Sequence, residues 1–150
     1  MSVTHDYNVS VKWQKDRMGL MATPDATQTI EVATPPQFPN GMEGIWSPEH
    51  LFTAAVNSCL MTTFLSIAEN SRLQYAEFSS SAAGKLEMVD GKYVMSEVTL
   101  RPVVMINNEE DRAKADRVLQ KAEQNCLISN SVKSRIIFEP TVTILSTVEA

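Results

Sequence analysis

The chain lacks the residue patterns that mark several common kinds of functional site. Only two cysteines and two histidines occur among its 150 residues, with neither CxxC nor HxxxH spacing. A zinc site is therefore disfavoured. A GxSxG motif and a glycine-rich phosphate-binding loop are both absent, which disfavours a serine hydrolase and a phosphate cradle. Apolar residues make up 43% of the chain, which argues against disordered, collagen-like and disulfide-scaffold classes.

Basic residues are also scarce. The chain contains thirteen lysines and arginines and eighteen aspartates and glutamates, so the formal net charge is −5. No basic cluster is present, and a nucleic-acid or anionic-lipid partner is not expected. The first residues carry neither a basic segment nor an apolar one, so we expect no signal peptide and a cytoplasmic location.

Residues 51–68 form the longest uncharged run, 18 residues in length. That length is at the lower limit for a membrane-spanning helix. The run contains six hydroxyl or amide side chains: Thr53, Asn57, Ser58, Thr62, Thr63 and Ser66. Because six polar groups are too many for lipid contact, we predict a helix buried in protein and no membrane partner.

Alternation of apolar and polar residues predicts a half-buried strand over residues 7–13. Short strands follow over residues 20–22 and 27–32. Prolines and glycines then crowd residues 34–48, which predicts a loop because proline lacks a backbone N–H and fixes an extended backbone.

A helix start is predicted directly after this loop. Ser47 suits the N-cap, Pro48 suits the first helical position, and Glu49 complements the helix dipole. We expect this helix to continue to about Asn70.

Two long strands are predicted over residues 75–89 and 92–106, joined by Asp90-Gly91, which favours a type I′ turn. Asn108 should cap a second helix, with an apolar stripe at helical spacing that ends on Cys126. Residues 136–148 complete the chain as a last strand.

The predicted order is therefore β-β-β-α-β-β-α-β. Hairpins dominate this order and alternating βαβ units are missing, which indicates an α+β fold. We expect one domain over residues 1–150, with antiparallel sheets and a long, buried central helix.

Cys59 lies well inside the uncharged helix, on a flank of small residues. Burial there should raise the pKa of its thiol, so a reactive Cys59 would need a cation from elsewhere in the chain. Cys126 lies on the apolar stripe of the second helix. From composition alone, inert core residues are the favoured interpretation of both thiols.

Two motifs resemble those of the OsmC/Ohr family of thiol-dependent peroxidases. Residues 48–59 read PE-x-L-x-x-AA-x-x-x-C, similar to the family's first cysteine motif, and residues 122–129 read AE-x-NC-x-IS, similar to the second. Arg17-x-Gly19 resembles the place of the family's active-site arginine. The order of strands and helices also agrees. One departure is Leu127, because the family often has proline after its second cysteine.

The resemblance implies reduction of organic hydroperoxides to alcohols. Cys59 would be the peroxidatic thiol and Cys126 the resolving thiol, joined in a disulfide that an external dithiol of lipoyl type reduces. Arg17 would hold the thiolate and the peroxide, and Glu49 would orient Arg17. No metal and no bound cofactor is implied.

Helix geometry adds an expectation about assembly. Glu49 and Cys59 are ten positions apart, about 15 Å along a helix axis and about 80° around it. We therefore expect an obligate homodimer whose sites take Cys59 and Arg17 from one chain and Glu49 from the other.

Two other functions fit the same sequence: a non-catalytic dimer that binds a hydrophobic ligand, and a structural dimer associated with stress. Both would have cysteines of ordinary reactivity, with a thiol pKa near or above about 8.5.

Overall fold

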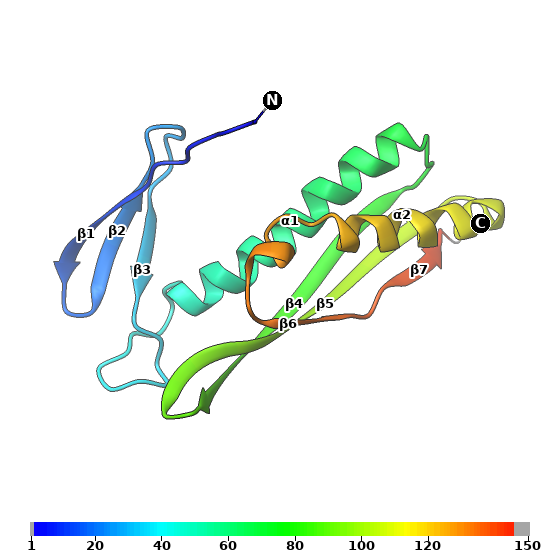
Figure 1. The fold of residues 1–150 in the computed structure, drawn as a ribbon. Helices are drawn as coiled ribbons and strands as arrows, with labels where there is room; N and C mark the ends of the chain where they lie inside the picture. Colours follow the sequence, from blue (N-terminus) through cyan, green and yellow to red (C-terminus); the bar gives the residue numbers. More distant parts are fainter. Residues whose placement is uncertain (1, 146–150) are drawn as a thin grey trace, which may run out of the picture. The chain divides into compact units, whose positions relative to one another are not determined.

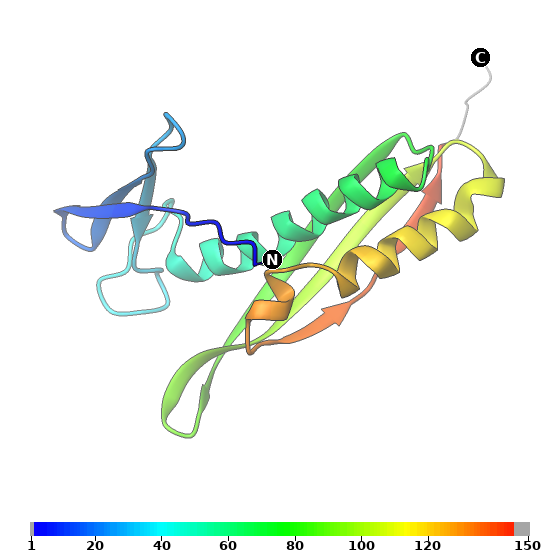
Figure 2. The same ribbon diagram turned by 45° about the horizontal axis from the view of Figure 1, so that its top comes forward.

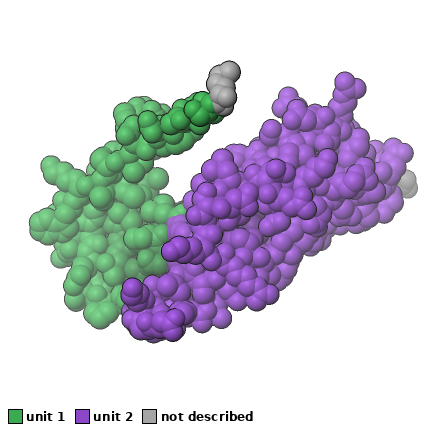
Figure 3. Space-filling model, in the orientation of Figure 1, with its two compact units in different colours: residues 1–51 green, residues 52–150 purple. Residues whose placement is uncertain are grey.

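The computed structural model describes residues 2–145. Contacts divide the chain into two compact units, residues 1–51 and 52–150 (Figure 3). Whether the chain forms a single domain stays a prediction.

Unit 1 (residues 1–51) contains a three-stranded antiparallel sheet in the order β1 (Ser10–Lys15), β2 (Met18–Ala22) and β3 (Ile30–Ala33). A tight turn joins β1 to β2, with Asp16 at a positive φ of 47°. The predicted strands are confirmed with shifted bounds. However, every residue of β1 is exposed, so the predicted half-burial of this strand is wrong for the single chain, which covers neither of its faces.

The proline-rich segment after β3 is the predicted loop, closed by backbone hydrogen bonds. The N–H of Met42 donates to the carbonyl of Thr34 at 2.9 Å, and the N–H of Gly41 donates to that of Phe38 at 3.0 Å. A Cβ atom on Gly41 would collide with the carbonyl of Pro35. Glycine at this position therefore lets the loop fold back on itself.

Helix α1 (Pro48–Asn70) confirms the predicted helix and its cap, since the His50 N–H donates to the Ser47 hydroxyl at 3.2 Å. By length and mean hydropathy, 1.6 over an 18-residue window, α1 could span a membrane, a test that core helices of soluble proteins also pass. Within the chain, 22% of that window is buried. The predicted burial thus holds for one stripe: Val56, Leu60, Phe64 and Ala68.

Unit 2 (residues 52–150) contains a long antiparallel hairpin of β4 (Glu77–Val89) and β5 (Lys92–Ile106). Asp90 and Gly91 have φ values of 51° and 79°, as the predicted type I′ turn requires. The hairpin is tied to α1 by a pair of hydrogen bonds, because Asn57 donates to the Ser80 carbonyl at 2.9 Å and accepts from the Ser80 hydroxyl at 2.6 Å.

The chain after β5 passes through η1 (Glu109–Asp111), α2 (Arg112–Gln124) and η2 (Ser129–Ser131) before β6 (Arg135–Phe138) and β7 (Thr141–Ile144). Both last strands pair with β5 in parallel, so the expected antiparallel sheet is in fact mixed. The reason is the crossover through α2, which returns the chain to β5 in the same direction.

Residues 136–148 were predicted as one strand, and the structure has two. Pro140 lies between β6 and β7, and a proline interrupts a strand because it cannot donate to the sheet. Residues 146–148 lie outside the described residues. Asn108 precedes η1 as predicted, but its side chain makes no capping hydrogen bond.

Both helices pack on one face of this sheet (Figures 1 and 2). The core between them takes residues from α1, β5 and α2, among them Leu60, Phe64, Leu100 and Leu119, none of which is exposed. The apolar stripe of α2 predicted from sequence is buried in full: Ala115, Val118, Leu119, Ala122 and Cys126.

Candidate active site

The structure brings the two cysteines together in unit 2. Cys59 lies in the middle of α1, and Cys126 lies two residues after the end of α2. The Cys126 thiol approaches the carbonyl of Val56 at 3.9 Å, one turn before Cys59, and also contacts the Cys59 thiol. Both thiols are free; Cys126 is fully buried and Cys59 is partly exposed.

The surroundings of Cys59 favour its thiolate. Burial by itself raises the pKa of this thiol, as the sequence suggests. Hydrogen bonds from the backbone N–H of Ile128, the Cys126 thiol, the Thr63 hydroxyl and the backbone N–H of Leu127 outweigh burial, so the pKa of Cys59 lies below its ordinary value. These donors are all neutral, and the need for a cation near Cys59 stays a prediction from the sequence.

The pKa of the Cys126 thiol is shifted in the opposite direction, above its ordinary value. Burial raises the pKa of its thiol, and the neighbouring Cys59 raises it further. Hydrogen bonds from Ser129 act in the other direction without cancelling the rise. The Cys126 thiol therefore stays protonated to a higher pH than the Cys59 thiol and donates a hydrogen bond to the Cys59 sulfur.

Sequence reasoning missed three of the groups that contact Cys59. Thr63 lies one helical turn after Cys59, with its hydroxyl 3.9 Å from the sulfur, and that spacing was visible in the sequence. The backbone N–H groups of Leu127 and Ile128 carry no side-chain signal. They are found only from the fold of the turn after α2.

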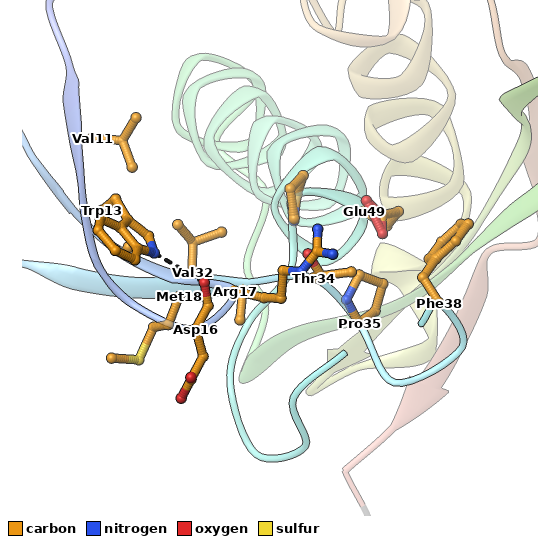
Figure 4. A pocket seen from close by; sticks show the side chains of 13 residues that line it. Val11, Trp13, Asp16, Arg17, Met18, Val32, Thr34, Pro35, Phe38 and Glu49 are labelled. Atoms are coloured by element: carbon orange, nitrogen blue, oxygen red, sulfur yellow. Dashed lines mark hydrogen bonds between the residues drawn. The ribbon is translucent and has the colours of Figure 1, made fainter. Parts of the chain in front are cut away.

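The other predicted pair, Arg17 and Glu49, lines a cavity of about 500 Å³ in unit 1 (Figure 4). Arg17 comes from the turn between β1 and β2, and Glu49 from the first turn of α1. Figure 4 shows the guanidinium group of Arg17 directed into the cavity, toward the side from which Glu49 enters.

The walls of this cavity are mostly apolar: Val11, Trp13, Met18, Val32, Ala33, Pro35, Phe38 and Pro48. The indole N–H of Trp13 donates to the carbonyl of Asp16 at 2.9 Å, which fixes the ring beside the turn that carries Arg17. A cation and a carboxylate within an apolar wall suit a ligand with one polar end and one hydrocarbon end.

The expected division of the site between two chains stays a prediction, and the single chain adds one observation to it. Arg17 and Glu49 of one chain line the same cavity, whereas we expected Glu49 to reach Arg17 from a partner chain. Among residues 2–145, no group of three or more metal-ligating side chains comes together.

The chain thus has an α+β fold, two contacting thiols in unit 2 and an arginine–glutamate cavity in unit 1. The model of the family described as OsmC-like protein matches residues 41–141. The chain belongs to this family.

Solved structures share this fold, and a curated sequence is also similar to the chain. An OsmC-like protein of unknown function from Vibrio cholerae is 25% identical, with a TM-score of 0.80 over 91% of this chain and 99% of that one. An organic hydroperoxide resistance protein from Elizabethkingia anophelis is 20% identical, with a TM-score of 0.75 over 97% and 100%. The uncharacterized protein YmaD of Bacillus subtilis is 20% identical over 88% of this chain and 89% of its own.

Proposed function

We propose that this protein is a thiol-dependent peroxidase that reduces organic hydroperoxides to alcohols. The observation that carries the proposal is the contact between the Cys59 and Cys126 thiols, whose pKa values move in opposite directions. A peroxidase with two thiols needs this difference, because one sulfur must attack as thiolate while the other waits as thiol.

In the first step the Cys59 thiolate attacks one peroxide oxygen and the O–O bond breaks. The alkoxide takes up a proton and leaves as the alcohol, and Cys59 becomes a sulfenic acid. The Cys126 sulfur then attacks the Cys59 sulfur, losing its proton, and the sulfenic oxygen leaves as water. An external dithiol of lipoyl type reduces the resulting disulfide by thiol–disulfide exchange and restores both thiols.

Arg17 and Glu49 have a supporting role in this proposal. A guanidinium group stays protonated throughout the reaction and can bind the peroxide oxygens beside the thiolate. Glu49 would orient the guanidinium group and offset the cost of burying its charge. The apolar walls of their cavity favour an alkyl hydroperoxide over hydrogen peroxide.

The active assembly would be a homodimer. Arg17 and Glu49 share a cavity in one chain, whereas Glu49 and Cys59 lie about 15 Å apart along the axis of α1. In this proposal, a site containing all three groups would take its Cys59 from a second copy. The protein would act in the cytoplasm, with no bound cofactor and no nucleic-acid or membrane partner.

The test is consumption of tert-butyl hydroperoxide and hydrogen peroxide with a lipoyl-type dithiol as reductant. We expect turnover with the organic peroxide, no reduction by Cys59→Ser, and about one equivalent consumed by Cys126→Ser, which stops at the sulfenic acid. Turnover by Cys59→Ser, or a reversal of the two roles, would contradict the assignment.

Iodoacetamide labelling across pH gives a second measurement. Alkylation follows the thiolate fraction, so the rate rises with pH through the thiol pKa and then levels off. Cys59 should reach half its maximal rate at a lower pH than an ordinary free thiol, and Cys126 at a higher pH.

The second candidate is a protein that binds a hydrophobic ligand in the Arg17–Glu49 cavity without catalysis. The apolar walls of that cavity favour it. In that case Cys59 would label as an ordinary thiol, and an alkyl carboxylate would bind while no peroxide is consumed.

A further inference from the structure

We propose that Thr63 is a positioning residue for Cys59, whose sulfur is bound by the Thr63 hydroxyl group and held in place on α1. The Thr63 Oγ1 and Cys59 Sγ atoms lie 3.9 Å apart, within reach of a hydrogen bond to sulfur. The inference deepens the proposed function and rests on it only for the peroxide step. The contact between hydroxyl and sulfur involves no peroxide.

The helix itself places this hydroxyl beside the sulfur. Thr63 follows Cys59 by four residues, and positions four apart lie one above the other on the same face of a helix. Threonine is β-branched, so few rotamers are open to its side chain in a helix. The hydroxyl is therefore held near Cys59 without the larger loss of side-chain entropy that a longer polar residue would carry.

Two other hydroxyl groups lie close to Cys59 in sequence, and both bind the backbone. The Ser58 hydroxyl donates to the Ala55 carbonyl at 3.3 Å, and the Thr62 hydroxyl donates to the Cys59 carbonyl at 3.1 Å. Both side chains are exposed, whereas that of Thr63 is half-buried. Of the three hydroxyls, only that of Thr63 is hydrogen-bonded to the sulfur within residues 2–145. Thr62 is therefore a matched control for Thr63.

The hydroxyl of Thr63 suits both protonation states of Cys59. A hydroxyl group can donate one hydrogen bond and accept others, and its proton rotates to suit its partner. It can therefore accept from the neutral thiol and donate to the thiolate while both heavy atoms stay in place. Because a hydrogen bond to an anion is the stronger of the two, the contact favours the thiolate. This agrees with the lowered pKa of Cys59, to which the Thr63 hydroxyl contributes.

The contacts of Thr63 and Cys126 lie on different sides of Cys59 along α1. The Cys126 thiol donates to the carbonyl of Val56 at 3.9 Å, three residues before Cys59, whereas Thr63 is four residues after it. Replacement of Cys126 therefore leaves Thr63 beside Cys59, and the contribution of each partner can be measured separately.

The test uses Cys126→Ser as background, in which Cys59 is the only cysteine of the chain. Iodoacetamide alkylation then reports on Cys59 alone, and its rate is measured across pH. Thr63→Val replaces the hydroxyl with a methyl group of similar size. This change should raise the alkylation midpoint by about half a pH unit, which leaves about threefold less thiolate well below the midpoint.

Two further variants separate the hydroxyl from other effects of substitution. Thr63→Ser keeps a hydroxyl at this position and should keep the original midpoint. Thr62→Val removes the neighbouring hydroxyl, which binds a carbonyl, and should leave the midpoint unchanged. An unchanged midpoint in Thr63→Val, an equal rise in Thr62→Val, or the same rise in Thr63→Ser would overturn the proposal.

Circular dichroism identifies a Thr63→Val variant that does not fold, and carbon-13 NMR of the unsubstituted threonine then decides the question. In the Cys126→Ser background, the Thr63 Cβ resonance should shift with the midpoint of Cys59 alkylation, because a hydrogen bond to a forming anion strengthens. Its shift should exceed that of the Thr62 Cβ resonance. An equal or smaller shift at Thr63 would contradict the contact.

The peroxide step is tested with both cysteines present. Thr63→Val should slow peroxide attack about threefold at a pH below the Cys59 midpoint and leave it unchanged well above the midpoint, where every Cys59 is ionised. An equal defect at both pH values would show a structural role and contradict the proposal. A shifted alkylation midpoint in a protein without turnover would keep the role of Thr63 and reject the peroxidase. Normal turnover with an unshifted midpoint would do the reverse.

Discussion

The two units of this chain differ in how they bury apolar surface. Every member of the hydrophobic core lies in unit 2, where α1, β5 and α2 meet. In unit 1 the buried positions are Gly19, Ala33, Pro35 and Ser47, all small or conformationally rigid. Large apolar side chains of β1, such as Val11 and Trp13, are 66% and 72% exposed.

Among residues 2–145, unit 2 therefore has its own stabilising core, whereas unit 1 has none. A three-stranded sheet without a covered face gains little from the hydrophobic effect. The open faces of unit 1 and of α1 are where the proposed homodimer would bury surface. The candidate site has the same division, with the thiols in unit 2 and the arginine–glutamate cavity in unit 1.

The largest effect is expected from mixing inactive variants. The experiment tests whether one chain supplies Arg17 and Glu49 to the site while the other chain supplies Cys59. Cys59→Ser mixed with Arg17→Ala should regain about a quarter of wild-type activity, because half the dimers are mixed and each has one intact site. Arg17→Ala mixed with Glu49→Ala should regain none. The measurement is peroxide turnover after co-refolding.

Recovery only in the mixture of Arg17→Ala with Glu49→Ala would show that Cys59 and Arg17 come from one chain and Glu49 from its partner. Recovery in neither mixture, although mixed dimers form, would place all three groups in one chain.

The next largest effect concerns the core of unit 2. Leu60 is fully buried, so Leu60→Ala should lower the free energy of unfolding by about 2–5 kcal/mol through lost burial and a cavity. Val11→Ala in unit 1 should change it by about 0.5 kcal/mol or less in the separated chain. Urea unfolding at several protein concentrations measures both.

If Val11 is covered in a dimer, Val11→Ala should instead favour dissociation of the dimer. The urea midpoint should then depend more strongly on protein concentration. If Leu60→Ala and Val11→Ala lower the free energy of unfolding equally at low protein concentration, the difference in apolar burial between the two units is contradicted.

A smaller effect is expected from adding a Cβ atom in the loop of unit 1. Gly41→Ala should cost about 1–3 kcal/mol, because the new atom meets the rigid carbonyl of Pro35. Gly84→Ala in unit 2 meets the movable side chains of Thr53 and Met95 and should cost about 1 kcal/mol or less. Thermal unfolding distinguishes them, and a larger loss at Gly84 would contradict this reasoning.

The smallest effect is expected at a surface ion pair of unit 2. Arg101 and Glu139 lie 3.3 Å apart with side chains 50% and 53% exposed. Arg101→Gln should change the free energy of unfolding by about 0.5 kcal/mol or less, because solvent and salt screen exposed charges. A loss above about 1 kcal/mol in urea unfolding would show a larger role for this pair.

Local sequence signals predicted best those helices and strands whose ends carry characteristic turn or capping residues. Residues 92–106 are the bounds of β5 as observed, because Asp90-Gly91 defines the preceding turn. Ser47 and Pro48 likewise marked the start of α1. The parallel pairing of β6 and β7 was missed, since strand direction depends on where a crossover helix returns the chain.

The sequence identified residues of the candidate site, but it did not predict which of them contact one another. The motifs singled out Cys59 and Cys126, and the structure places their thiols together. Arg17 and Glu49 were also named, but assigned to different chains. The backbone donors at Leu127 and Ile128 were not predictable, because every residue except proline carries an N–H group.

The sequence by itself determined the helix start, the type I′ hairpin, the buried stripe of α2 and the family, since each depends on residues near one another in the chain. Only the tertiary structure decided which groups share a cavity and which donors reach Cys59. The two cysteines are 67 residues apart in sequence, and packing of α2 against α1 brings them together. The energy of that packing comes from many contacts that no short motif contains.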